Sequence, residues 1–240
     1  MITGIIVALP DEISSLTNKK VNKGDCIFIN DKILLTCSGA GPKNATNASL
    51  LLIKKGAKRL ISWGCAAALK AELSPGNLVL PKNLQSEMQE KISLESPWLT
   101  HTLDHLSDFN PLTGLLTESH NIVAESSEKQ TIHSQSGAIA LDMESVAIAK
   151  AAKKYNFPTL VIRSIADPVT MSLPKAVSYA LNSQGDLILS KLLWFLLTHP
   201  NELPALIKLG LHFKAAKNKL KSVSKQLDTI VSFEQKTVIK

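Results

Sequence analysis

Two carboxylates in this chain follow apolar runs of strand length, and they mark the place where we expect chemistry. Glu144 comes soon after the run at 138–141, and Asp167 follows the run at 159–165. The apolar spacing over 143–152 predicts an amphipathic helix between the runs, so together they form a strand–helix–strand unit of a parallel sheet. Ligands of open α/β sheets bind at the carboxyl ends of the strands. Glu144 and Asp167 are therefore the first candidates for an active site.

Glu12 is a third acid near the end of an apolar run, residues 2–8, at a place where Pro10 opens a short helix. Proline at the first helical position and acids in the first turn are regular start signals of helices. A carboxylate there also complements the helix dipole, and this structural role is the alternative to a catalytic one.

Gly39 and Gly41 lie between a predicted hairpin over 26–37 and a helix over 45–55. Glycine at a strand-to-helix junction lets the backbone approach a ligand, and amides exposed there attract anions. Lys43 is a candidate partner for such an anion, with simple solvation of its side chain as the alternative. The glycine spacing differs from the dinucleotide-binding pattern.

Cys65 and Ala66 belong to a run of small residues, 64–68, that follows a strand predicted over 60–63. Small residues after a strand let a flat ligand or another backbone approach closely. A tightly packed turn without a ligand is the alternative.

The composition of the 240 residues, with 45% hydrophobic and 20% charged, is typical of one large α/β domain. The three cysteines, Cys26, Cys37 and Cys65, have no paired spacing, so we expect reduced thiols and neither disulfides nor a metal site. No apolar run reaches the length of a transmembrane helix, and the first residues lead directly into a strand. These features predict a cytoplasmic protein without a signal peptide.

The net charge of +7 is concentrated at the end of the chain, where residues 201–240 hold eight lysines against three acids. The two arginines, Arg59 and Arg163, lie elsewhere. Proteins that read nucleic acids or clamp phosphate favour arginine for its bidentate fork. We therefore expect no nucleic-acid partner and attribute the lysine-rich tail to contact with a diffuse anionic surface.

The remaining segments supply the elements around these residues. We expect a strand at 78–81, an irregular lid at 83–111, short strands at 115–116 and 122–123, a helix at 126–134, and a loop with one helical turn at 168–182. An apolar helix is predicted at 186–198. After a break at 199–200, an amphipathic helix is predicted at 202–227, with lysines on its other faces.

Five segments of the chain, spread over residues 4–167, carry a resemblance to a known family. They are GIIVALPDE, SGAGPKNA, WGCAAALKAELSPGNLVLP, ALDMESVAIAKAA and VIRSIAD. In this order they resemble the purine nucleoside phosphorylase and methylthioadenosine/S-adenosylhomocysteine nucleosidase superfamily. The resemblance implies a single-domain α/β phosphorylase-like fold, with a mixed central sheet flanked by helices, and no cofactor.

The same resemblance implies roles for the candidate residues in cleaving a purine N-glycosidic bond, which develops positive charge on the ribose and negative charge on the base. Asp167 matches the position that protonates the leaving adenine. Glu144 matches the position that binds the ribose hydroxyls, with Met143 packed on the sugar, and Glu12 matches the acid that orients the attacking water. The other substrate-binding positions are Cys65, Ala66, Gly39 and Gly41.

Two departures from the family pattern bear on this chemistry. The usual small-Ala-Gly-Gly loop reads Cys-Ala-Ala-Ala at residues 65–68, and the two added methyl groups would tighten or obstruct the base pocket. The arginines that clamp phosphate in true phosphorylases are missing, because Arg163 falls inside a predicted strand and Arg59 precedes another. We therefore expect water rather than phosphate as the nucleophile, and phosphate remains the alternative co-substrate.

Residues 173–216 resemble the C-terminal extension of hopanoid-associated phosphorylases. This implies release of adenine from adenosylhopane, a triterpenoid joined to the 5′ carbon of adenosine. The chain then divides into a phosphorylase-like domain at 1–198 and a basic amphipathic helical extension at 199–240, which we expect to attach to the inner face of an anionic membrane. A homo-oligomer is also expected.

Two other functions remain open at this point. The first is a nucleosidase acting on soluble methylthioadenosine or S-adenosylhomocysteine. The second is a non-catalytic protein that binds adenosine-like ligands at a membrane, which the Cys-Ala-Ala-Ala loop favours and the three acids oppose.

Overall fold

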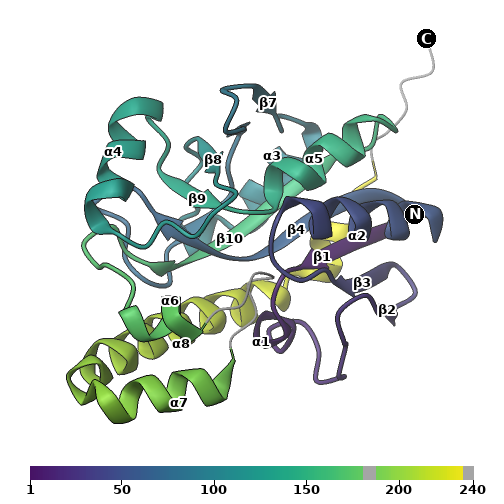
Figure 1. The fold of residues 1–240 in the computed structure, drawn as a ribbon. Helices are drawn as coiled ribbons and strands as arrows, with labels where there is room; N and C mark the ends of the chain where they lie inside the picture. The colour runs from purple at the N-terminus through teal and green to yellow at the C-terminus, as the bar shows by residue number, and fades with distance from the viewer. Residues whose placement is uncertain (181–187, 235–240) are drawn as a thin grey trace.

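The computed structural model describes residues 1–180 and 188–234, and its centre is a mixed sheet of ten strands in that part of the chain (Figure 1). The strands are β1 (Ile2–Val7), β2 (Cys26–Asn30), β3 (Ile33–Cys37), β4 (Ala57–Ala68), β5 (Leu78–Val79), β6 (Asn83–Gln85), β7 (Lys91–Ser93), β8 (Leu116–Glu118), β9 (Ala140–Asp142) and β10 (Thr159–Asp167). The helices are α1 (Pro10–Ile13), α2 (Pro42–Lys54), α3 (Pro97–His105), α4 (Ser126–Ser136), α5 (Ser145–Lys153), α6 (Lys175–Ala180), α7 (Leu189–Thr198), α8 (Leu203–Ser224) and α9 (Leu227–Ser232), with short 3₁₀ turns η1 (Ser107–Phe109) and η2 (Pro200–Glu202).

Strand β4 organises the sheet. Its twelve residues are mostly buried, and β1 and β10 pair with it in parallel on its two edges. Beyond the end of β1, the last residues of β4 pair with β9 in antiparallel orientation, through Ala67 and Leu141. Across the sheet, the order of the strands is β2-β3-β1-β4-β9-β8-β6-β7, and β10 and β5 lie on the other edge of β4. One long strand therefore joins the two parts of the sheet.

The predicted unit β9–α5–β10 has the expected elements, but its two strands are not parallel. Strand β10 runs parallel to β4 and β9 runs antiparallel to it, so β9 and β10 run in opposite directions. Apolar periodicity identifies a strand, a helix and a strand, but it does not say which edges pair. Because β9 runs back along β4, its carboxyl end points towards the middle of β4. The acid that follows β9 thus still meets the acid that ends β10.

Several predicted boundaries are also wrong. The strand predicted at 60–63 continues through the small residues 64–68, which are part of β4 and not a loop after it. The segment predicted as a lid at 83–111 contains β6, β7, α3 and η1, since β6 finds partners in β7 and β8, which are distant in sequence. Residues 122–123 form no strand. The predicted hairpin, the helix after it and the helix in the 126–136 region are present.

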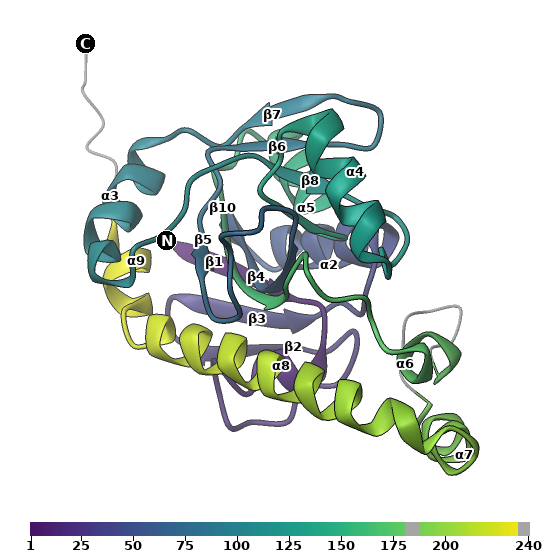
Figure 2. The same cartoon turned by 90° about the vertical axis from the view of Figure 1, so that its left-hand side faces the viewer.

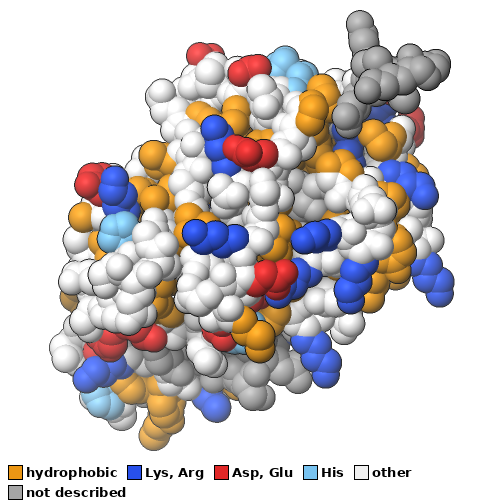
Figure 3. Space-filling model, turned by 90° about the horizontal axis from the view of Figure 1, so that it is seen from above, with side chains coloured by type: hydrophobic (Ala, Val, Ile, Leu, Met, Phe, Trp, Pro, Cys, Tyr) orange, Lys and Arg blue, Asp and Glu red, His pale blue; other side chains and the backbone are white. Residues whose placement is uncertain are grey.

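The helices form layers on both sides of the sheet. Helices α2 and α5 lie together on one face, and α8 crosses the opposite face against β10 and β4 (Figure 1). Seen from above, basic side chains are scattered among acidic, hydrophobic and uncharged groups, without one continuous basic surface (Figure 3). With helices on both faces of the sheet, the molecule has the expected α/β layering.

The C-terminal helices divide between the core and the surface. The predicted helix 202–227 is present as α8, which ends at Ser224, and a further helix, α9, begins at Leu227. The second half of α8 buries Ala216, Leu220 and Val223, and the last two belong to the same core as the sheet. Helix α7 packs mainly on α6 at the far end of α8 (Figure 2). The buried contacts of α7 are with α6 and with Leu206 of α8. The predicted start of this helix at 186–187 lies outside the described residues.

Candidate active site

The acids singled out in the sequence lie around one cavity of about 320 Å³. Glu12 comes from α1, Glu144 from the start of α5, and Asp167 from the end of β10. Segments more than 150 residues apart in the sequence meet here because all of them border the second half of β4. The other lining residues are Ala8, Leu9, Ala40, Cys65, Ala66, Ala67, Asn121, Ile122, Val123, Leu141, Asp142, Met143, Arg163, Ala166, Leu173, Val177 and Phe213.

The Glu12 carboxylate is buried and oriented by two backbone amides. It accepts hydrogen bonds from the Cys65 amide at 2.7 Å and from the Leu9 amide at 3.1 Å. Burial raises the pKa of Glu12, and the Arg163 guanidinium opposes that rise. The side chain thus does more than complement the dipole of the four-residue helix α1.

Glycine at position 64 makes room for this arrangement. A Cβ atom there would lie 2.7 Å from Glu12 Oε1 and 2.6 Å from Arg163 Nη1, closer than van der Waals contact allows. The absence of a side chain on β4 lets the Glu12 carboxylate and the Arg163 guanidinium both approach the strand.

Glu144 follows β9, where Asp142 fixes the start of α5 by accepting hydrogen bonds from the Glu144 and Ser145 amides. The Glu144 carboxylate accepts a hydrogen bond from the Gly41 amide at 3.0 Å. Gly41 has a φ of 92°, a backbone conformation that residues with a side chain rarely adopt. Burial raises the pKa of Glu144 to about 7, while Arg163 lowers it and Asp142 raises it further. This carboxyl group can therefore exchange protons near neutral pH.

Arg163 lies in this site, so the prediction that no arginine is near it is wrong. Its Nε is 2.7 Å from Asp142 Oδ2, and its Nη2 is 3.4 Å from Glu144 Oε2. The guanidinium also donates to Ser62 Oγ at 2.8 Å and to the Cys65 carbonyl at 3.2 Å. An arginine inside an apolar strand needs buried acceptors. This feature of the sequence could have indicated that Arg163 lies beside buried acids.

Asp167 has a partner that the sequence did not suggest. Lys129, on α4, has no exposed surface, and its Nζ lies 2.6 Å from each of the Asp167 carboxylate oxygens. Burial raises the pKa of Asp167, and the ammonium of Lys129 acts against that rise. The expected helix around 126–134 is present, but nothing in its pattern marks this lysine as buried.

The remaining predicted residues divide between lining and supporting positions. Met143, Cys65 and Ala66 line the cavity. Gly39 and Gly41 do not line the cavity, whereas Ala40 between them does. The Gly41 amide nevertheless donates a hydrogen bond to the Glu144 carboxylate. Lys43 is exposed on the first turn of α2, away from the cavity wall.

One wall of the cavity is apolar and comes partly from the tail. The apolar lining residues include Leu173, Val177 of α6 and Phe213 of α8, together with Ile122 and Val123 from the loop after β8. The lining of the cavity thus combines a group of acids with a set of apolar side chains.

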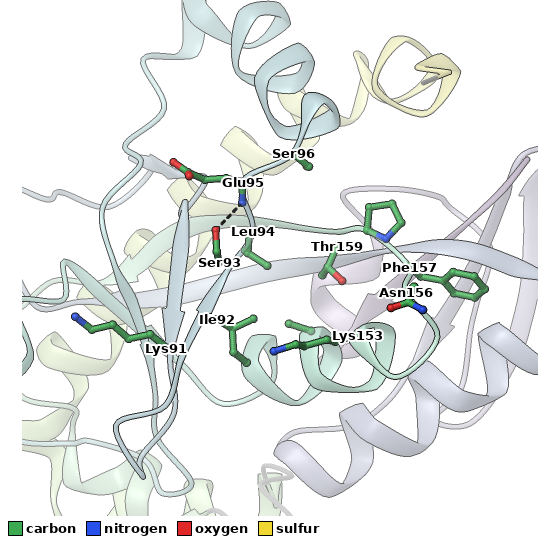
Figure 4. Close-up of a pocket in the computed structure, with 12 residues that line it drawn as sticks. Lys91, Ile92, Ser93, Leu94, Glu95, Ser96, Lys153, Asn156, Phe157 and Thr159 are labelled. Carbon is green, nitrogen blue, oxygen red and sulfur yellow. Dashed lines mark hydrogen bonds between the residues drawn. The ribbon is translucent and has the colours of Figure 1, made fainter. Parts of the chain in front are cut away.

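A second cavity, of about 380 Å³, lies at the opposite end of β10 (Figure 4). Lys91 of β7, Glu95 and Lys153 of α5 are its charged residues, and Thr159 begins β10 there. Since β10 has nine residues, this cavity is roughly 26 Å from Asp167 at about 3.3 Å per residue. It has no group of acids comparable to the first cavity.

The comparisons with known proteins agree with this geometry. The model of the Phosphorylase superfamily matches residues 3–181. This chain belongs to the phosphorylase superfamily. The expected superfamily and α/β fold are thereby confirmed.

Among the similar members of the superfamily is a 5′-methylthioadenosine/S-adenosylhomocysteine nucleosidase of Buchnera aphidicola, which is 28% identical over 209 residues, covering 75% of this chain and 83% of the relative. A Helicobacter pylori nucleosidase with 5′-methylthioadenosine in its active site has a TM-score of 0.70 at 16% identity, covering 96% of this chain and 98% of its own. The futalosine hydrolase of the same organism has a TM-score of 0.67 at 16% identity, covering 96% and 97%. These structures share the fold with this member of the superfamily.

Proposed function

We propose that this enzyme cleaves the N-glycosidic bond of an adenosine-type nucleoside that carries a large apolar group on its 5′ carbon, with adenosylhopane as the substrate that fits best. The observation that carries the proposal is one cavity whose lining contains Glu12, Glu144 and Asp167 together with apolar side chains that include Phe213. Membership of the phosphorylase superfamily and the nucleosidase relatives support an enzyme over a non-catalytic binder.

The acids suit the charges that develop in this reaction. Breaking the bond leaves positive charge on the ribose, which the Glu144 carboxylate stabilises while it accepts hydrogen bonds from the ribose hydroxyls. Asp167 gives a proton to the leaving base, a step worth about 10²–10⁴ in rate when the acid is positioned. Glu12, held by the Cys65 and Leu9 amides, orients the attacking water. Met143 packs on the sugar.

Water is the nucleophile in this proposal. Arg163 is the arginine at the site, and its nitrogens are already taken up by Asp142, Glu144, Ser62 and the Cys65 carbonyl. Phosphate recognition relies on free guanidinium forks, and the Glu12 carboxylate repels an incoming phosphate. Lys43, the other candidate for anion binding, is exposed outside the cavity.

The tail supports a lipid-linked substrate. Helices α7 and α8 expose several large apolar side chains: Leu193, Trp194, Leu197, Leu203, Ile207 and Leu211. Lysines at 191, 208 and 214 accompany them. Among the described helices, none combines the length and hydrophobicity that a bilayer crossing requires. Apolar side chains together with lysines favour reversible attachment to an anionic membrane surface, where such a substrate resides.

A soluble nucleosidase is the second candidate, because relatives with that activity cover most of this chain. The test is chromatography of released adenine after incubation with 5′-methylthioadenosine, S-adenosylhomocysteine or an adenosyl-lipid in anionic vesicles, each with and without phosphate. We expect the highest kcat/KM for the adenosyl-lipid and no dependence on phosphate. Preference for the soluble substrates would favour the second candidate, and a ribose 1-phosphate product would overturn the choice of nucleophile.

A further inference from the structure

Lys129 is buried at the active site with each of its donors directed at the chain around Asp167. Besides the two Asp167 oxygens at 2.6 Å, its ammonium donates to the Met171 carbonyl at 2.8 Å and lies 3.4 Å from the Pro168 carbonyl. An ammonium has three donors, so the carboxylate and these carbonyls account for all of them. Lys129 thus ties α4 to the end of β10 and to the segment that follows.

We propose that Lys129 is a positioning residue, which holds the Asp167 carboxyl group against the cavity and stabilises the carboxylate left behind when Asp167 protonates the leaving base. The inference rests on the proposed function, in which Asp167 is the general acid. No other element in the described chain provides an ionic partner for Asp167.

The proton balance shows what the lysine does. The electron pair of the C1′–N9 bond moves onto the base as the proton leaves the Asp167 carboxyl for a ring nitrogen of the base. The acid and ammonium together carry one positive charge before this step, and the ion pair that remains is neutral. An ammonium 2.6 Å from both oxygens favours the ionised form, so it makes Asp167 a stronger acid. Solvent returns the proton after the base departs.

This role predicts a specific pH dependence. Asp167 must be protonated to act, so activity falls as pH rises through its pKa. The other charged groups lining the cavity are Glu12 from α1, Asp142 and Glu144 from the end of β9, and Arg163 from β10. They remain when Lys129 loses its charge, and so does the burial that raises the pKa of Asp167. The fall in activity should therefore move to higher pH.

The experiment compares the pH dependence of kcat in the wild type and in Lys129→Met, Lys129→Gln and Lys129→Arg, with 5′-methylthioadenosine and the adenosyl-lipid as probes. We expect Met and Gln to lower the plateau rate at least about tenfold and to move the alkaline fall upwards by about one pH unit or more. Arginine keeps the charge and should keep the position of the fall. Lys153→Met, which removes an exposed lysine on α5, is the matched control.

The glutamine in Lys129→Gln retains a donor for the Met171 carbonyl, so this variant keeps the test valid if Lys129→Met does not fold. A folded Gln or Met variant with the wild-type profile would overturn the role of Lys129. Asp167→Asn separates this result from a failure of the proposed function. If Asp167→Asn retains more than about a tenth of the wild-type rate, the acid role itself is wrong.

Discussion

At the level of single residues, the site combines acids and cations that are nearly all withdrawn from water. Burial raises the pKa of Glu12, Glu144 and Asp167, and a cation opposes the rise in each case. Arg163 plays this part for the first two acids and Lys129 for the third. The pKa values of Glu12 and Glu144 therefore depend on a cation from β10, and the pKa of Asp167 depends on a different cation, from α4.

The raised pKa of Glu144 predicts how stability depends on pH. Its pKa is about 7 in the folded protein, against an ordinary value of 4.5. Between these values the folded protein keeps a proton that the unfolded chain has lost, so the contribution of Glu144 to stability falls as pH rises through this window. The drop in Tm between pH 5 and pH 8, measured by calorimetry, should be smaller in Glu144→Gln. An equal drop in both proteins would count against the raised pKa.

The Lys129–Asp167 pair predicts strong coupling between two substitutions. Removing one partner of a buried ion pair leaves an uncompensated charge, at a cost of about 3–5 kcal/mol. We expect Lys129→Met and Asp167→Asn each to lower the free energy of unfolding substantially, and the double variant to lose much less than the sum. Denaturant titration of the four proteins measures the coupling. Additive losses would show that the two side chains do not interact.

At the level of elements, β4 provides the surface on which the site is built, and Gly64 is its critical position. Gly64→Ala places a Cβ atom against Glu12 and Arg163, so it should lower kcat by at least about tenfold and reduce stability by about 1–3 kcal/mol. Gly210→Ala is the matched control, because Gly210 in α8 has open space around it. Alanine there should stabilise the protein by about 0.5–1 kcal/mol. Normal activity of Gly64→Ala would contradict the close approach.

The first half of α8 and helix α7 form the surface that we expect to meet the membrane. Trp194 and Leu197 are 64% and 78% exposed, and Ile207 is 56% exposed. Replacing these three with serine removes apolar contact without touching the core. In liposome flotation, the wild type should bind anionic vesicles and detach at high salt, and the triple variant should bind several-fold less. Lys54→Gln on α2 controls for charge, and equal flotation of the triple variant would exclude this surface.

At the level of the whole molecule, the C-terminal helices complete the core. The residues after 198 that are buried against the sheet or beside it are Ala216, Leu220, Val223, Leu227, Ile230 and Val231. Arg59, on the far part of β4, also donates to the carbonyls of Val231 and Phe233. A chain truncated after Thr198 loses five large buried side chains at about 1.5–3 kcal/mol each. Circular dichroism should show no cooperative thermal transition in this chain, and a wild-type transition would contradict the packing.

The sequence by itself determined the order and type of most elements and the acids of the site. Apolar runs marked β1, β3, β4, β9 and β10, and the acids after the runs of β1, β9 and β10 pointed to Glu12, Glu144 and Asp167. These inferences depend on local spacing, which a strand or a helix shows along its own length. The superfamily was also evident from the sequence, because five segments that resemble it occur in the family's order along the chain.

Only the tertiary structure decided which of these elements meet. It placed β9 antiparallel to β4, brought Arg163 to Asp142 and Glu144, and buried Lys129 beside Asp167. It also divided α8 into a half packed on the sheet and a half that exposes Ile207 and Leu211. Pairing partners, buried charges and the covered face of a helix depend on contacts between residues far apart in sequence. The periodicity of one segment carries no record of those contacts.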